Sequence, residues 1–267
     1  MVETVKNAWK IPELRKKLLF VIVAMIVFRF GHAIYVPYVD TKSLATQFAA
    51  YSSTILGYFN ILAGGGLSQA SVFALSVYPY INSSIIMQLL QVAIPSLERL
   101  ARDGGEEGKK KIASITRYVT IGLSLIMGYS YYVLLKTYGV LTRTDLWSGI
   151  VIVLTFVAGS SFVMWLGDQI STKGIGNGVS LILFIGIVSR GPSALMSMVS
   201  GVAAGTLAWW KAAIILVLFV AIIAFIVFIT NAERRIPVQY AKRVVGRKQY
   251  GGQSTFLPMK VNMAGVM

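Results

Sequence analysis

The chain alternates between long apolar runs and short polar segments. Most of the runs reach the roughly 20 residues that an α-helix needs to cross about 30 Å of hydrocarbon at 1.5 Å per residue. They predict six membrane-spanning helices, at Leu18–Val36, Val72–Ile94, Ile112–Leu135, Leu146–Leu166, Val179–Ser189 and Trp210–Thr230. This pattern predicts an all-α polytopic membrane protein, and a content of 56% hydrophobic residues agrees with that class.

Two stretches depart from the regular pattern. The fifth run is short and follows the Gly-rich segment 174–178, so its helix must begin in irregular backbone. Such backbone is tolerated at membrane depth only next to protein or water. Residues 54–71 (TILGYFNILAGGGLSQAS) are too few to cross and are broken by three consecutive glycines. A surface loop, a re-entrant half-helix and a cap over a pore all fit this second stretch.

Positive charge is distributed unevenly between the polar segments. The chain carries 25 Lys and Arg residues against 10 Asp and Glu, a formal net charge of +15. Nineteen of the 25 fall on one side of the membrane once the six runs are threaded through it. The positive-inside rule makes that side, and with it the N-terminus, cytosolic. This basic face could meet anionic headgroups, RNA or an acidic partner.

Few residues offer enzyme or metal chemistry. The chain has no cysteine, which excludes disulfides and thiolate metal sites. The only histidine, His32, precedes every candidate serine nucleophile, and the zinc-protease and Walker motifs are absent from the sequence. Small residues such as those at 159–161 more often mark close helix packing. Arg29 and His32 are the clear ionisable residues inside a span, and we expect Arg29 to reach the interface or a carbonyl group. We therefore expect no enzyme and no cofactor.

The second run combines an apolar stripe with unusual polarity. Val77, Ile81 and Ile85 repeat at i, i+4 and i+8 and share one helix face. Around them lie five polar residues: Asn82, Ser83, Ser84, Gln88 and Gln91. Because amides are costly in hydrocarbon unless hydrogen-bonded, this helix should border protein or water. A helix in the bundle core and a helix lining a pore both remain open.

Three motifs closely resemble the SecY family, the channel subunit of the bacterial Sec protein translocon. Residues 167–180 (GDQISTKGIGNGVS) resemble its cytosolic turn into the fifth helix, residues 59–86 its plug and second helix, and residues 234–265 its loop after the sixth helix. The matches run in the family's order from about Phe28 to the last residue. Tyr35 and Tyr38 depart from the proline and glycine that the family often has there.

The resemblance implies a division of the chain. Members have ten spans in two pseudo-symmetric halves, so we expect the first half and a sixth helix, with the second half missing. The implied parts are a cytosolic N-terminus (1–17), a five-helix half (18–190) with a plug at about 55–67, an outer loop and sixth helix (191–230), a basic cytosolic loop (231–257) and the start of a seventh helix (258–267).

The resemblance also implies four sets of site residues. The pore ring would be formed by Val77, Ile81 and Leu183. The plug would contain Tyr58, Phe59, Asn60, Ile61, Leu62, Gly64, Gly65 and Gly66. Its apolar side chains would pack against the closed pore, and its glycines would supply hinge conformations closed to other residues. The lateral gate would include Ile85, Gln88, Gln91 and Thr116. Docking of the ribosome or of the motor ATPase SecA would use Arg234, Arg235, Lys242, Arg243, Arg247 and Lys248.

The function that the resemblance implies is transport of unfolded preproteins across the bacterial plasma membrane, with lateral release of signal sequences and membrane helices into lipid. The implied partners are SecE, SecG, SecA, the ribosome through its RNA, preprotein signal sequences and membrane lipids. A secondary transporter with broken helices around a midplane site is the rival hypothesis. The Gly-rich entry at 174–178 favours the rival, and the scarcity of carboxylates inside the spans opposes it.

Overall fold

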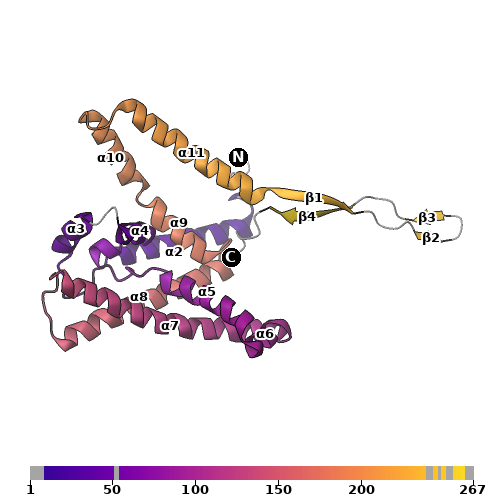
Figure 1. Cartoon of the computed structure of the whole chain (residues 1–267), viewed down its shortest axis with the longest axis horizontal. Helices are drawn as coiled ribbons and strands as arrows, with labels where there is room; N and C mark the ends of the chain where they lie inside the picture. Colours follow the sequence, from indigo (N-terminus) through magenta and orange to yellow (C-terminus); the bar gives the residue numbers. More distant parts are fainter. Residues whose placement is uncertain (1–8, 51–53, 239–242, 246–247, 251–254, 262–267) are drawn as a thin grey trace. The chain divides into compact units, whose positions relative to one another are not determined.

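The computed structural model describes residues 9–50, 54–238, 243–245, 248–250 and 255–261. The chain divides into two compact units, residues 1–193 and 194–267, and each is described by itself. The first unit is helical and its elements are α2 (Pro12–His32), α3 (Thr41–Ala50), α4 (Ile55–Leu62), η1 (Leu67–Gln69), α5 (Tyr78–Ala93), α6 (Pro95–Arg102), α7 (Gly105–Thr137), α8 (Leu146–Lys173) and α9 (Gly178–Val188) (Figure 1). Helix α10 (Gly191–Ala203) crosses the division. The second unit continues with α11 (Trp209–Asn231) and four strands.

Four helical stretches in the described part of the chain are long and apolar enough to cross a membrane. They are Gly105–Thr137, Leu146–Lys173, Gly178–Ala203 and Trp209–Asn231. The third stretch joins α9 to α10. Helix α9 confirms the short fifth helix predicted at 179–189, and the chain directly after it, predicted as an outer loop, is helical. Helix α2 has 21 residues and carries basic residues near both ends.

The second predicted span is helical only from Tyr78 to Ala93, which is 16 residues. Pro79 lies in the first turn of α5, where its missing N–H costs nothing, whereas a helix running through it would lose a hydrogen bond. Just before the helix, Ser76 has a φ of +48°. Residues 71–77, here called the connecting segment, are therefore an irregular buried stretch and not part of the helix.

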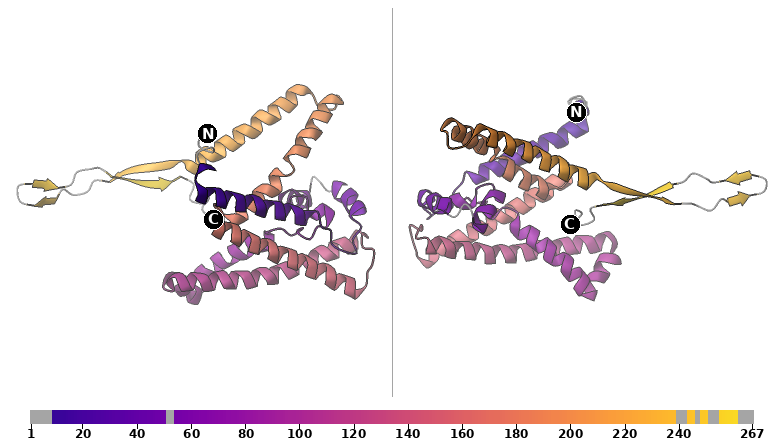
Figure 2. Two further views of the ribbon diagram at one scale, coloured as in Figure 1. Left: turned by 180° about the vertical axis from the view of Figure 1, so that it is seen from behind. Right: turned by 45° about the horizontal axis from the view of Figure 1, so that its top comes forward.

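The basic segment after α11, predicted as a loop at 231–257, contains a β-hairpin within an otherwise helical chain. Strand β1 (Glu233–Val238) pairs antiparallel with β4 (Thr255–Lys260), and β2 (Arg243–Val245) pairs with β3 (Lys248–Tyr250) (Figure 2). Residues 258–260, predicted to open a seventh helix, lie in β4; residues 262–267 lie outside the described residues. Pro258 is tolerated because both strands of a two-stranded ladder are edges.

Two buried apolar clusters hold the first unit together. One packs α3, α7, α8 and the loops around them, and its fully buried side chains include Leu44, Leu135, Ile152 and Phe156. The other lies between α2, α8, α9 and the connecting segment, and consists of Val21, Ala24, Phe28, Phe73, Val77, Val163, Leu166, Ile170 and Ile182. The second cluster contains the candidate pore residue Val77, and the candidates Ile81 and Leu183 pack against it.

Candidate functional site

The candidate site is built on residues 54–70, here called the plug segment, which lead directly into the connecting segment and α5. The plug segment consists of α4, a turn at 63–66 and the short η1 helix. Asn60 ties the two helices together, because its side-chain oxygen accepts a hydrogen bond of 3.0 Å from the Ser68 backbone N–H. The plug segment is thus a folded unit and not an extended surface loop.

The buried face of α4 is the small and polar one. Gly57 and Asn60 are buried, whereas Tyr58, Phe59, Ile61 and Leu62 are exposed, Tyr58 to 66% of its surface. The expectation that these four apolar side chains pack against a closed pore stays a prediction. Only Phe59 has a described ring contact, at 5.5 Å from the ring centre of Tyr78.

The three glycines of the turn serve two purposes. Gly64 and Gly65 have φ values of +65° and +89°, in the left-handed region that favours glycine, as predicted. Gly66 does not have a positive φ, and the prediction is wrong there. It is small for a different reason, because an added Cβ would lie 2.8 Å from Ser71 Oγ and 3.1 Å from Ala74 Cα.

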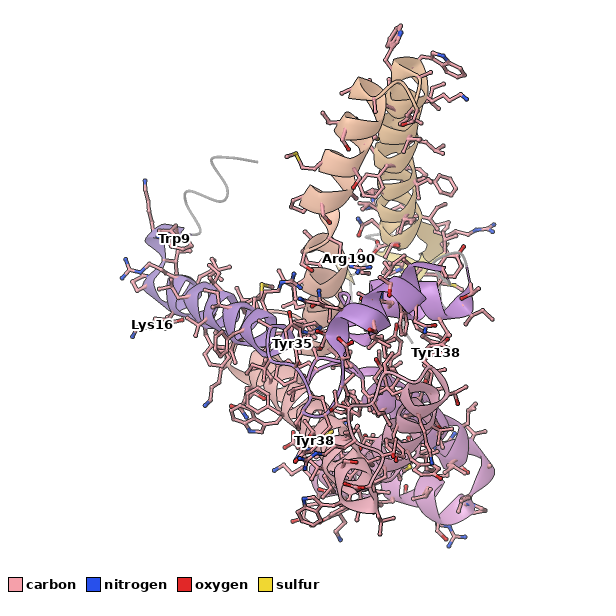
Figure 3. All side chains as sticks on the ribbon, turned by 90° about the vertical axis from the view of Figure 1, so that its left-hand side faces the viewer. Trp9, Lys16, Tyr35, Tyr38, Tyr138 and Arg190 are labelled. Atoms are coloured by element: carbon pink, nitrogen blue, oxygen red, sulfur yellow. The ribbon has the colours of Figure 1, made fainter. Side chains whose placement is uncertain are left out.

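Two basic residues that lie far apart in the sequence meet the turn at 63–66. His32 at the end of α2 is buried, and its Nε2 lies 2.9 Å from the Ala63 carbonyl oxygen. Arg190, which follows α9, lies beside α4 with its guanidinium group over Gly65 (Figure 3). Sequence reasoning named His32 as an ionisable residue inside a span without giving it a role, and it did not single out Arg190. The only usable signal was that each is an ionisable residue at the end of an apolar helix.

The structure brings the three predicted pore-ring residues into one cluster. Val77 is fully buried in the second apolar cluster, and Ile81 and Leu183 pack against it while remaining partly exposed. Val77 precedes the first turn of α5 instead of lying within the helix, but its carbonyl oxygen still accepts the Ile81 N–H at 3.0 Å. The i, i+4 spacing therefore places Ile81 one turn beyond Val77, as the stripe predicted.

The predicted gate residues do not share one environment. Ile85 and Gln88 are exposed on α5, and Gln91 is half-buried. Thr116 is buried where α5 packs on α7, and its backbone oxygen accepts a hydrogen bond of 2.8 Å from Ser83 Oγ. The polar residues of α5 thus serve two purposes. Ser83 joins α5 to α7 by a hydrogen bond, and the side-chain amides of Asn82 and Gln88 are exposed.

The Gly-rich entry to α9 is a tight corner between α8 and α9. Asn177 caps α9, since its side-chain oxygen accepts the Val179 N–H at 3.0 Å. An added Cβ at Gly178 would lie 2.0 Å from the Gly167 carbonyl oxygen. At the same corner Asp168 forms an ion pair of 2.8 Å with Arg117 of α7. The motif at 167–180 therefore encodes a close helix crossing, and its one acidic side chain is already paired.

Tyr35 and Tyr38, which stand where proline and glycine were expected, lie in the turn after α2. Tyr38 has a φ of +66°, the conformation for which glycine is favoured, and Arg143 lies 5.9 Å from the centre of its ring. A cation–π contact of this kind can offset part of the left-handed strain. The turn thus keeps its shape with tyrosine, and Tyr35 forms an isolated bridge to Ser71.

The predicted docking residues are only partly described. Arg234 and Arg235 are exposed on β1 and pair with Met259 and Pro258 of β4. The backbones of Arg243 and Lys248 lie in β2 and β3. Lys242 and Arg247 lie outside the described residues.

Comparison with known proteins shows which family this chain belongs to. The sequence model of SecY matches residues 71–267, which include the connecting segment, α5 and the Gly-rich corner. This chain belongs to the SecY family. Protein translocase subunit SecY of Pseudomonas aeruginosa is 44% identical over 257 residues, covering 96% of this chain and 58% of that protein. The SecY of Escherichia coli K12 is 42% identical over 259 residues, again with 96% and 58% covered.

Solved structures support the SecY fold independently of sequence. The structure described as "The structure of a protein conducting channel" has a TM-score of 0.63 at 16% identity, covering 96% of this chain and 57% of that one. "The plug domain of the SecY protein stablizes the closed state of the translocation channel and maintains a membrane seal" has a TM-score of 0.64 at 15% identity and covers 96% and 56%. This SecY chain spans about three-fifths of the length of the curated relatives it matches.

Proposed function

We propose that this chain forms the first part of a protein-conducting channel that passes unfolded preproteins across the bacterial plasma membrane. The observation that carries the proposal is the continuity of residues 54–81. A folded plug segment runs without a break into a buried apolar cluster, where Val77 and Ile81 meet Leu183 of α9. A plug and an apolar ring are the two parts that a closed protein channel needs.

The apolar ring suits a pore for unfolded chains. A constriction lined by branched apolar side chains expels water and so blocks ions, yet it makes no fixed polar contact with a passing polypeptide. Val77, Ile81 and Leu183 supply part of such a ring, and the remainder would come from the part of the protein beyond this chain. Energy for transport would come from the motor ATPase SecA or from the translating ribosome, so the channel itself needs no catalytic residue.

The exposed face of α5 is proposed as one wall of a lateral gate. Ile85 and Gln88 lie on this face, with Gln91 half-buried next to them. A signal sequence is an apolar helix and would partition between this wall and lipid by the same burial energy that inserts any membrane helix. Thr116 is buried behind the wall, so its proposed role is to join α5 to α7.

The basic hairpin is proposed as the cytosolic docking surface for the ribosome or SecA. The excess of Lys and Arg on one side supports a cytosolic N-terminus and a cytosolic hairpin. Clustered positive charge suits contacts with RNA phosphates or an acidic protein surface. Changing Arg247 and Lys248 to Glu should weaken ribosome or SecA binding with little loss of membrane insertion. Binding that is unchanged at moderate salt would contradict this assignment.

The proposal is tested with the full-length protein, purified with its small partner subunits SecE and SecG and reconstituted in vesicles with SecA and ATP. We expect a preprotein to become protected from added protease only when its signal sequence is present. The break between α8 and α9 at 174–178 is the feature that a secondary transporter would share. Saturable uptake of a small solute, without preprotein protection, would support that rival and overturn the channel.

A further inference from the structure

The plug segment is attached mainly at its C-terminal end. Residues 63–66 are buried, whereas α4 exposes its apolar side chains along most of its length. Beyond the turn, the Tyr131 hydroxyl donates a hydrogen bond to the Leu67 carbonyl oxygen, and the Val36 N–H donates to the Ala70 carbonyl oxygen at 2.9 Å. The segment after the turn is therefore fixed to α7 and to the loop after α2, whereas α4 is held by the Asn60–Ser68 hydrogen bond, the Phe59–Tyr78 ring contact and its approach to α9.

We infer that His32 and Arg190 form a latch that holds the plug closed at residues 63–65, where α4 pivots. The inference rests on the proposed channel function and adds two positioning residues to it. The pivot lies at the turn because Gly64 and Gly65 adopt left-handed φ values there and can rotate with little steric cost.

The His32 part of the latch is one directed hydrogen bond. The Ala63 carbonyl oxygen belongs to the turn directly after α4 and lies 2.9 Å from His32 Nε2. His32 Nδ1 lies 3.2 Å from the Phe28 carbonyl oxygen, and the imidazole packs edge-on to the Phe28 ring at 4.6 Å. These contacts hold the imidazole within α2. Because a neutral imidazole carries one N–H, the latch uses the tautomer whose Nε2–H donates to the Ala63 carbonyl oxygen. If α4 swings out, the carbonyl oxygen of Ala63 reaches water instead.

Arg190 contributes to the latch by covering Gly65, one of the two glycines at which α4 pivots. An added Cβ at Gly65 would lie 2.8 Å from Arg190 Nη2, so the guanidinium group covers this glycine directly. Arg190 also borders a cavity of about 290 Å³ together with Asn60, Ile61 and Ser68. Asn60 and Ile61 are in the last turn of α4, where the helix dipole favours a nearby cation. The charge of Arg190 therefore stabilises α4 in its closed position.

Backbone contact between α9 and the pivot completes the latch. An added Cβ at Gly64 would lie 3.2 Å from Gly186 Cα, and one at Gly186 would lie 3.3 Å from the Leu62 carbonyl oxygen. Because Arg190 follows α9 directly, any displacement of α9 moves both this contact and the guanidinium group. Displacement of α9, whose Leu183 belongs to the proposed ring, would thus release the plug at the same time.

The test measures small-ion leak from vesicles that contain the full-length channel with its partner subunits and no preprotein. His32→Phe keeps the aromatic packing and removes the donor, and Arg190→Leu removes the charge. We expect His32→Phe to raise the leak about five-fold or more, the ratio that corresponds to about 1 kcal/mol for one buried hydrogen bond. His32→Gln and Arg190→Lys should restore part of the seal, because they keep a donor and a charge respectively.

Two control variants match the changes in chemistry. Ser124→Ala removes a buried hydroxyl that donates to the Ile121 carbonyl oxygen of its own helix, and Lys42→Gln removes an exposed positive charge on α3. Both should leak like the wild type. Wild-type leak in His32→Phe and Arg190→Leu, with preprotein transport intact, would overturn the latch. Absence of preprotein transport in the wild type would instead overturn the proposed function. If His32→Phe fails to assemble, Arg190→Leu decides alone, since Arg190 is only half-buried.

Discussion

Replacing Gly159 by alanine should destabilise the bundle strongly, because the backbone of the connecting segment occupies the space that a side chain would need. A Cβ at Gly159 of α8 would lie 2.0 Å from the Val72 carbonyl oxygen, 2.9 Å from the Val72 carbonyl carbon and 3.0 Å from its Cγ1. An ordinary carbon–oxygen contact is more than an ångström longer than the first of these, and backbone cannot rotate away as a flexible side chain can. Overpacking typically costs about 1–3 kcal/mol, and an obstacle made of backbone belongs at the upper end.

Gly122 of α7 is the matched control, since it is also a helical glycine but an added Cβ would meet nothing within 4 Å among the described atoms. Gly122→Ala should be neutral or slightly stabilising through helix propensity, by up to about 1 kcal/mol. A loss of about 3 kcal/mol in Gly159→Ala corresponds to a melting temperature lower by about 6–12 °C at 2–4 °C per kcal/mol. The assay is thermal unfolding of the purified full-length complex in detergent. Equal melting of the two variants would refute the close approach of α8 to the connecting segment.

Two further predictions concern charged groups. The ion pair between Arg117 and Asp168, at 2.8 Å with partly exposed side chains, should show a coupling of about 0.5–1 kcal/mol in a double-mutant cycle of melting temperatures, and strictly additive effects would contradict it. The Ser43 hydroxyl donates a hydrogen bond to Asp40, which lowers the pKa of that carboxyl group below its usual value. Because the pKa is depressed in the folded state, the stabilisation is present above about pH 4 and is lost as the pH falls. Wild type should therefore melt above Asp40→Asn at pH 6, and the difference should shrink as the pH is lowered further; a difference that does not change with pH would contradict this assignment.

The helices were the most predictable part of the fold, because a long apolar run in a membrane protein satisfies its backbone hydrogen bonds most readily as a helix. Hydrophobicity did not show where α5 begins, since the connecting segment is as apolar as a span but buried in irregular form behind Pro79. The same limit applied to α10, whose sequence is less apolar than that of α9 and was predicted to begin a loop. The hairpin was missed because its charged residues suggested a solvated loop, although residues 255–260 combine threonine, phenylalanine and leucine with a proline that only an edge strand accepts.

The site was predictable in position but not in orientation. The motif at 59–86 located the plug segment and the cluster of Val77 and Ile81. Which face of α4 would be buried could not be predicted, because the small Gly57 and the amide of Asn60 pack inward while the larger apolar side chains remain exposed. His32 could be recognised as an ionisable residue inside a span, but its contact emerges only from the fold, which brings the end of α2 to a carbonyl group 31 residues further along the chain.

The most direct test of the channel function places a single cysteine at Ile81 of the otherwise cysteine-free chain, in the full-length complex. A stalled secretory chain that carries one cysteine supplies the partner, and Ile126→Cys on the exposed face of α7 is the control. We predict a disulfide at Ile81→Cys that requires both a signal sequence and SecA or a ribosome, and none at Ile126→Cys. If Ile81→Cys does not react while a cysteine on the basic hairpin still does, Ile81 serves ordinary helix packing and the channel proposal is contradicted.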